Sequence, residues 1–169
     1  MAYNFDTLID RTNTNSIKWN REIIPEDCRD AIPLWVADMD FASPPEVQAA
    51  ILERASHPIY GYTNRSEEYY RSFIEWMKRR NNWDIQKEWI VFSPGVIPAL
   101  NIAVLAYTHP GDKIIIQPPV YYPFASAVLN NGRQLVENPL IIRDGRYTMD
   151  FDDLKKKIDS HTKLFILCS

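Results

Sequence analysis

Apolar and polar positions separate a weakly patterned beginning of the chain from a strongly patterned remainder. Residues 1–42 show little helical or strand periodicity, and the polar run at 10–16 (Asp-Arg-Thr-Asn-Thr-Asn-Ser) is typical of a loop or turn. We therefore interpret residues 1–42 as an arm that accompanies a domain. The domain itself is expected over residues 43–169.

Two helices are expected in the first part of this domain. The sequence Ser-Pro-Pro-Glu at 43–46 is typical of a helix start, so we predict a helix over residues 44–56 with Ser43 as its cap. Ser66 followed by two glutamates marks a second start, and the Asn-Asn pair at 81–82 marks its end. The second helix carries apolar side chains at helical spacing, which we expect in the core: Tyr69, Phe73, Trp76 and Met77.

From residue 89 onward, short β-rich runs alternate with helical stretches. Such alternation predicts an α/β fold with a mainly parallel sheet and helices packed on its faces. Asp144-Gly145 between apolar residues suggests a small hairpin inserted in the series. The expected strands are 89–92, 113–117, 134–137 and 163–168, and the expected helices are 95–107, 122–131 and 150–158.

The last expected strand, 163–168, is apolar, and the chain stops directly after it. In open parallel sheets, ligands bind at the carboxyl ends of the strands. The chain therefore stops where a loop of the binding site is expected, and truncation of a larger domain is the simplest interpretation.

Composition excludes several classes of function. The 169 residues are 46% hydrophobic, enough for a globular domain, and 19 basic and 22 acidic residues give a net charge of -3 without long blocks. We expect no nucleic-acid or membrane partner from this balance. Because neither a leader pattern nor a bilayer-spanning apolar run is present, a cytoplasmic protein is expected. Cys28 and Cys168 follow no metal-ligand spacing, so we expect reduced thiols and no metal site.

Two loops carry the candidate chemistry. Ser-Pro-Gly-Val-Ile at 93–97 joins an expected strand to a helix, and Gly95 there permits close approach of the backbone to an anion. The segment matches neither the dinucleotide nor the P-loop glycine pattern, so an anion site and a plain turn both stay open. The loop Gln-Pro-Pro-Val-Tyr-Tyr-Pro-Phe at 117–124 brings aromatic rings to the same sheet edge, where they either stack on a flat cofactor or pack under the loop.

Four motifs occur together in a fixed order: Trp-Val-Ala-Asp-Met-Asp-Phe at 35–41, Tyr-Gly-Tyr at 60–62, the segment 93–97, and Pro-Val-Tyr at 119–121. In order and spacing they resemble the MalY/PatB-type cystathionine β-lyases, a branch of the fold-type I enzymes that use pyridoxal 5'-phosphate (PLP). The resemblance covers essentially the whole chain. It implies an incomplete PLP-binding large domain, preceded by the arm and a small-domain segment.

The resemblance also implies roles for individual residues. The amides of Gly95 and Val96 would hold the cofactor phosphate, and Tyr121 would stack on the pyridine ring. Tyr62 would reach the phosphate of the neighbouring subunit's cofactor, which implies a homodimer. Ala37 would line the substrate cleft. The lysine that binds the cofactor and the aspartate that pairs with its ring nitrogen are expected downstream, so this chain is expected to hold no catalytic residue.

The implied activity is carbon–sulfur β-elimination from cystathionine or cysteine S-conjugates, which gives a thiol, pyruvate and ammonia, with PLP as the electron sink. An aminotransferase with the same cofactor site stays open, as does a non-catalytic product that acts through protein contacts. The family's sheet order, 3-2-4-5-6-7-1, assigns strands 1 to 4 to this chain, so the strand 163–168 would expose an apolar edge. The chain by itself is therefore expected to be inactive and poorly soluble.

Overall fold

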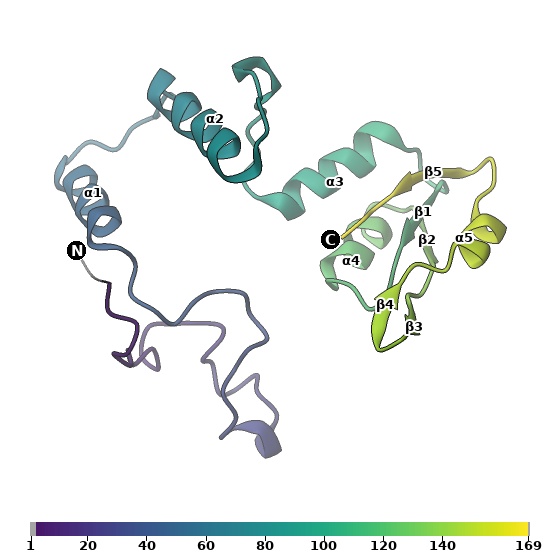
Figure 1. The fold of residues 1–169 in the computed structure, drawn as a ribbon, viewed down its shortest axis with the longest axis horizontal. Helices are drawn as coiled ribbons and strands as arrows, with labels where there is room; N and C mark the ends of the chain where they lie inside the picture. Colours follow the sequence, from purple (N-terminus) through teal and green to yellow (C-terminus); the bar gives the residue numbers. More distant parts are fainter. Residues whose placement is uncertain (1–2, 169) are drawn as a thin grey trace. The chain divides into compact units, whose positions relative to one another are not determined.

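The computed structural model describes residues 3–168, and the chain divides into two compact units, Met1–Arg65 and Ser66–Ser169. The first unit holds η1 (Glu26–Cys28) and α1 (Pro45–Ser56), and the second holds all the strands of the described residues (Figure 1). The predicted arm and α1 thus share one unit. The assignment of α1 to the large domain stays a prediction.

Charged side chains organise the arm, although it has little regular structure. Arg11 donates to Asp38 at 2.5 Å and to Asp40 at 2.6 Å. The Lys18 ammonium donates to the Asp40 carboxylate and to the Asp38 carbonyl, each at 2.7 Å, and Trp19 Nε1 donates to Asp40 at 2.7 Å. Lys18 is only 4% exposed, so these contacts compensate a buried charge. The network ties the tryptophan-containing motif of the arm to the polar run that precedes it.

Helix α1 begins one residue later than the sequence pattern predicts. Pro44 is the residue that precedes its first turn, and no side chain caps that turn. The prediction that Ser43 caps the helix is wrong, because Ser43 lies one residue outside the capping position, from which a hydroxyl reaches the first amides. The Ser43 carbonyl instead accepts a hydrogen bond from Gln48 Nε2 at 2.6 Å.

Helix α2 (Glu67–Asn81) begins and ends where its sequence signals predict. Ser66 Oγ accepts a hydrogen bond from the Tyr69 amide at 3.2 Å, as an N-terminal cap does. At the other end, Asn82 adopts the left-handed conformation with φ 49°, which ends the helix. Local signals within a few residues of each end therefore fix the length of this helix.

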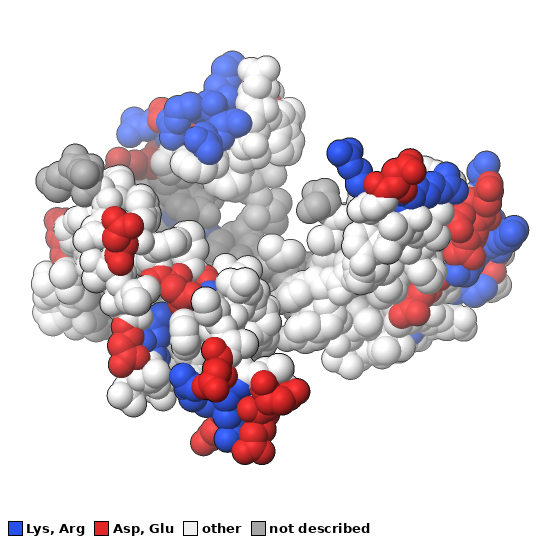
Figure 2. Space-filling model, turned by 60° about the horizontal axis from the view of Figure 1, so that its bottom comes forward, with Lys and Arg blue, Asp and Glu red and all other residues white. Residues whose placement is uncertain are grey.

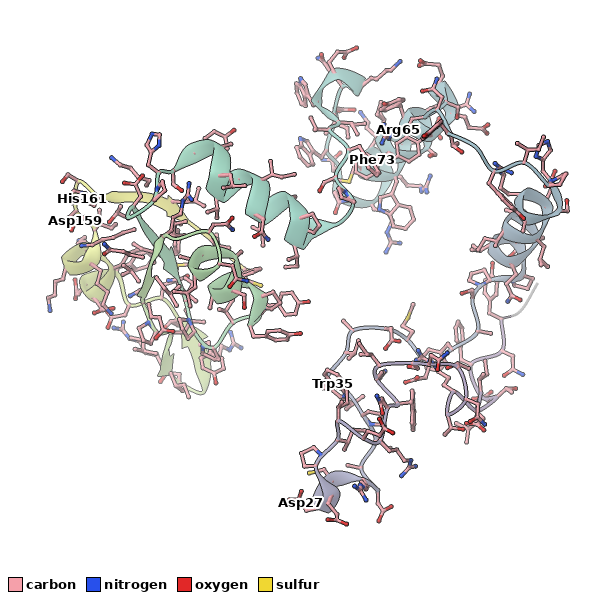
Figure 3. All side chains as sticks on the ribbon, turned by 180° about the vertical axis from the view of Figure 1, so that it is seen from behind. Asp27, Trp35, Arg65, Phe73, Asp159 and His161 are labelled. Carbon is pink, nitrogen blue, oxygen red and sulfur yellow. The ribbon has the colours of Figure 1, made fainter. Side chains whose placement is uncertain are left out.

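The apolar stripe of α2 is exposed in the described unit, so the prediction that it lies in the core is wrong there. Phe73 is 45% exposed and Trp76 is 51% exposed, and Phe73 projects from α2 in Figure 3. The element that packs against α2 is η2 (Lys87–Trp89), a single turn. One turn is too short to cover a stripe that runs along a four-turn helix.

The strand predicted at residues 89–92 is also absent from the described residues. Trp89 ends the 3-10 turn η2, and Ile90 is extended, with φ -90° and ψ 112°, but pairs with no strand. A strand exists only where a neighbour completes its hydrogen-bond ladder. No described strand lies beside this segment to do so.

The predicted alternation of helices and strands beyond residue 95 is confirmed in type and order. The observed elements are α3 (Val96–Tyr107), β1 (Lys113–Ile116), α4 (Pro123–Leu129), β2 (Gln134–Glu137), β3 (Ile141–Arg143), β4 (Arg146–Thr148), α5 (Phe151–Lys157) and β5 (Thr162–Phe165). The hairpin of β3 and β4 turns at Asp144 and Gly145, which adopt φ 49° and 74°. Asp150 caps α5 by accepting from the amides of Asp152 and Asp153.

Three strands form a parallel sheet in the order β2-β1-β5, which confirms the α/β fold. This order equals the 3-2-4 part of the expected sheet. Figure 1 shows α4 and α5 on either side of the three strands. The core lies between the sheet and the helices α3 and α4, and its buried members are Val104, Ile114, Ile116, Phe124, Val128 and Ile166.

Within residues 3–168, no helix is long and apolar enough to cross a membrane. In the same range, no group of histidine, cysteine, aspartate and glutamate side chains could hold a metal ion. Acidic and basic side chains both occur on the face shown in Figure 2, interspersed with uncharged surface.

Candidate functional site

A cavity of about 640 Å³ opens at the carboxyl ends of β1 and β5 in the second unit. Because the two strands are parallel, their carboxyl ends meet at one edge of the sheet, which is where ligands bind in such folds. The loop after β1, the hairpin with its flanking residues and the segment after β5 supply the lining: Gln117, Pro119, Val120, Tyr121, Leu140, Tyr147, Thr148, Met149 and Cys168.

Helix α3 directs its first amides toward the same edge of the sheet. The helix ends at Tyr107, and the chain then enters β1 at Lys113, so the end of α3 lies near the amino end of the strand. Figure 1 shows the beginning of α3 and the end of the chain on the same side of the sheet. The amino end of α3, which carries partial positive charge, thus belongs to the ligand-binding edge.

Gly95 is the residue that precedes α3, with φ 130° and ψ 168°, a conformation that favours glycine. No side chain caps the first turn, and that turn contains no acidic residue. Val96, its first residue, is exposed. Ser93 Oγ donates to the Gly95 carbonyl at 2.8 Å, so the serine steadies the turn without occupying the amides. An anion can therefore accept from this helix start.

A buried arginine holds the opposite end of α3. Arg133 is 8% exposed; its Nε donates to Thr108 Oγ1 at 2.8 Å and its Nη2 donates to the Thr108 carbonyl at 2.6 Å. Thr108 Oγ1 in turn donates to the Val104 carbonyl at 2.5 Å. A cation at the carboxyl end of a helix satisfies its last carbonyls and opposes its dipole. This contact anchors α3 to the start of β2.

Tyr121 presents a ring at the cavity. It is 53% exposed, and its ring lies edge-on to Phe124, with the centroids 5.9 Å apart and an interplanar angle of 84°. Phe124 is buried in the core, so packing under the loop is confirmed for this ring. Tyr122 is 74% exposed and does not line the cavity. Of the three aromatic side chains, Tyr121 is thus the one available for stacking.

The other predicted site residues, Tyr62 and Ala37, belong to the first unit. Both are exposed there. Tyr62 follows Gly61, which has φ 47°, and Ala37 lies beside Asp38 of the charged network. Their roles toward a cofactor or substrate stay predictions.

The sequence patterns did not single out Gln117, which lines the cavity, or Asn138, which contacts Gln117. Gln117 lines the cavity and is 5% exposed, and Asn138 is completely buried; the Gln117 Nε2 donates to Asn138 Oδ1 at 2.7 Å. Each is a polar residue placed directly after a strand of a parallel sheet. That position is a signal that could have revealed both.

The amino-terminal edge of the sheet holds charged groups of a different kind. Lys113 donates to Asp159 at 2.5 Å, and the His161 amide donates to the same carboxylate at 2.9 Å (Figure 3). Lys163 Nζ donates to the Ser160 carbonyl near the start of β5. Lys163 therefore lies at the edge of the sheet opposite the cavity.

Residues at this edge of the sheet fit a phosphate-bearing aromatic cofactor: Tyr121 lines the cavity, and Gly95 and Val96 lie outside its lining. The uncapped start of α3 suits a phosphate, and the exposed face of Tyr121 suits a planar ring. An added Cβ at Gly95 would meet Pro98 Cδ at 3.6 Å, which is an ordinary contact. Backbone conformation rather than crowding is thus the reason for glycine at this position.

A parallel α/β sheet with an uncapped helix start and a half-exposed tyrosine at its carboxyl edge is the arrangement of a partial fold-type I domain of PLP enzymes. Residues 29–169 match the aminotransferase class I and II family, and the chain belongs to that family. The prediction of this fold from the sequence is confirmed.

The chain is similar to individual proteins of known name or structure. The chain is 45% identical over 167 residues to cystathionine β-lyase PatB of Bacillus subtilis, covering 98% of this chain and 43% of the relative. A PLP-bound putative aminotransferase from Clostridium difficile matches with a TM-score of 0.89 and 45% identity, over 99% of this chain and 43% of that one. Cystalysin from Treponema denticola, which contains PLP, matches with a TM-score of 0.85 and 40% identity, over 98% and 43%. The chain thus spans less than half the length of these relatives.

Proposed function

We propose that the protein to which this chain belongs binds PLP at the carboxyl edge of β1 and β5. The amides of Gly95 and Val96 would hold the phosphate, and the Tyr121 ring would lie against the pyridine. The observation that carries this proposal is the uncapped, acid-free start of α3, with Gly95 at φ 130°, at the same sheet edge as the half-exposed Tyr121.

The proposed reaction is β-elimination of a thiol from cystathionine or a cysteine S-conjugate, with pyruvate and ammonia as the other products. PLP, when bound, supplies an electron sink for this chemistry. The residues of this chain bind and orient: the α3 start fixes the anionic end, and Tyr121 covers one face of the ring. The similarity to PatB and cystalysin supports the lyase reaction.

An aminotransferase is the second candidate, because the family and the Clostridium difficile relative bear that name. Both reactions use the same phosphate and ring contacts. The choice between β-elimination and transamination depends on the groups that contact the substrate.

Three further parts of the proposal concern the whole protein. Tyr62 would contact the cofactor phosphate of a neighbouring subunit in a homodimer, and its full exposure within its own unit supports this role. Ala37 would line the substrate cleft. A cytoplasmic location agrees with the two exposed, unpaired thiols of Cys28 and Cys168.

The test is an assay of a full-length protein that carries this chain, purified and saturated with PLP. With cystathionine alone, we expect pyruvate and thiol in equal amounts. Turnover that requires an added 2-oxo acid and yields the matching amino acid would instead establish the aminotransferase. Absence of PLP binding would contradict both.

A further inference from the structure

A buried polar chain connects the cavity to α5. Gln117, at the cavity, donates to the side chain of the completely buried Asn138 at 2.7 Å. Asn138 Nδ2 donates to the Asp150 carbonyl at 3.1 Å and to Asp153 Oδ2 at 2.8 Å. One amide side chain thus joins the edge of the cavity to the first turn of α5.

The polar chain ends at α5 in a charged pair that is held by hydrogen bonds. Lys157 donates to Asp153 at 2.6 Å and to the Glu137 carbonyl at 2.7 Å. Hydrogen bonds from Lys157 and from Asn138 lower the pKa of Asp153 below its ordinary value. The Asp153 carboxylate therefore stays ionised and accepts from both side chains.

The same segment also fixes the backbone of the loop that carries Tyr121. The Asn138 amide donates to the Ile116 carbonyl at 2.9 Å, and the Leu140 amide donates to the Pro118 carbonyl at 2.7 Å. Residues 138–140 thus hold the start of the loop by its main chain, and Asn138 holds it a second time through Gln117. A polar network with all its groups satisfied specifies one arrangement, since any shift leaves a buried group unpaired.

We infer that Asn138 is a positioning residue for the cofactor ring: through Gln117 it fixes the start of the loop and hence the place of Tyr121. This inference rests on the function proposed above, in which Tyr121 stacks on PLP. Asn138 itself does not line the cavity, so its effect passes through Gln117.

Exchanging the hydrogen-bonding side chains of Asn138 and Asp153 tests this role. Asn138→Asp keeps an acceptor for Gln117 but turns an oxygen toward Asp153 and the Asp150 carbonyl. In a full-length protein that carries this chain, we expect the PLP Kd to rise about tenfold, as the loss of a buried donor predicts. The visible circular dichroism of bound PLP, which reports how the ring is held, should weaken as well.

The double variant Asn138→Asp with Asp153→Asn restores a donor–acceptor pair between the two side chains and should recover the Kd and the dichroism.

Gln117→Met removes the same hydrogen bond from the cavity side and should weaken the dichroism, even if Asn138→Asp does not fold. The matched control is Asn131→Asp, since Asn131 also donates from Nδ2 to a side chain and a carbonyl, Asn101 and Ala127, each at 2.7 Å. It should lower the melting temperature and leave the dichroism unchanged.

Wild-type Kd and dichroism in both Asn138→Asp and Gln117→Met would overturn the positioning role, as would an equal loss of dichroism in Asn131→Asp. Tyr121→Ala separates this failure from that of the proposed function. If Tyr121→Ala weakens PLP binding while Asn138→Asp does not, only the positioning role fails. If Tyr121→Ala leaves binding and dichroism unchanged, the stacking function itself fails.

Discussion

At the scale of single residues, the candidate site depends on backbone shape at Gly95 and on one exposed ring at Tyr121. Gly95 has a backbone conformation that a side chain rarely adopts, with no crowding around it. Tyr121 lies against the buried Phe124 and keeps about half its surface exposed. We make a separate prediction for each residue, because the proposed contact of Gly95 is with the phosphate and that of Tyr121 is with the ring.

Gly95→Val should weaken PLP binding in a full-length protein that carries this chain. Valine at φ 130° adds backbone strain of about 1–3 kcal/mol and turns the first amides of α3 away from the anion. We expect the Kd from titration of the apo-protein to rise at least about tenfold. Gly111→Val is the matched control, since Gly111 has φ 89° with open space around it and precedes the opposite end of β1. Equal Kd increases in the two variants would contradict the phosphate role.

Tyr121→Ala should raise the PLP Kd by about 5- to 150-fold, as the loss of 1–3 kcal/mol of aromatic stacking predicts. Tyr121→Phe keeps the planar face and should retain most of the affinity. Tyr122→Ala serves as control, because Tyr122 does not line the cavity. The same measurement applies to all three variants, and unchanged affinity in Tyr121→Ala would refute stacking.

At the scale of elements, long-range polar contacts hold segments that have few local determinants. Arg133 anchors the carboxyl end of α3, and the network around Asp40 gives the arm a defined path. Both use a buried cation between partners that are distant in sequence. Only the arm network contains carboxylates, so the stability of the arm depends on their ionisation.

The arm should therefore lose its structure at acid pH. Hydrogen bonds from Lys18, Trp19 and Arg11 hold the pKa of Asp40 far below its ordinary value. A depressed pKa in the folded state stabilises the arm above the unfolded value, about 3.9, and this contribution is lost as the pH falls below it. Limited proteolysis at about pH 7 and at about pH 3, on either side of the unfolded value, should show faster cleavage within residues 11–40 at the acid end.

Asp40→Asn should make the arm sensitive to protease already at neutral pH, because the neutral amide leaves the buried Lys18 without its close carboxylate. Its cleavage rate should also change less with pH than that of the wild type. Asp27→Asn is the control, since Asp27 is an exposed carboxylate on η1 (Figure 3). If Asp40→Asn and Asp27→Asn behave alike, the charged network does not order the arm.

At the scale of the whole molecule, the second unit presents an apolar sheet edge and a cavity without a lysine. β5 is an edge strand of the sheet; its last residue, Phe165, is 39% exposed, and Leu167, two residues further on, is 56% exposed. An unpaired edge of this kind pairs readily with another chain. Among the described residues, no lysine lines the cavity.

The 169-residue chain by itself should therefore release no pyruvate from cystathionine above the rate of free PLP, and it should self-associate. Leu167→Lys should reduce the association measured by sedimentation, because a charge on the edge opposes strand pairing. Leu129→Lys, at an equally exposed leucine on α4, should reduce it less. Enzymatic turnover by the chain alone would contradict the first expectation, and a monodisperse monomer would contradict the second.

The sequence by itself determined the elements whose signals are local. The ends of α2, the Asp150 cap of α5 and the turn at Asp144-Gly145 each depend on atoms within a few residues, so composition and spacing predict them. The alternation of types after residue 95 likewise predicted a parallel sheet. With the motif at 93–97 and Tyr121, it also indicated where the candidate site lies.

Only the tertiary structure decided the features that need a distant partner. The segment 89–92 has strand-like residues, yet no neighbouring strand completes its ladder, and the stripe of α2 is apolar, yet little covers it. Conversely, Gln117 and Asn138 are ordinary polar residues until the parallel pairing of β1 with β2 brings them within a hydrogen bond. Local sequence sets conformational preference, but burial and pairing depend on which segments the fold places side by side.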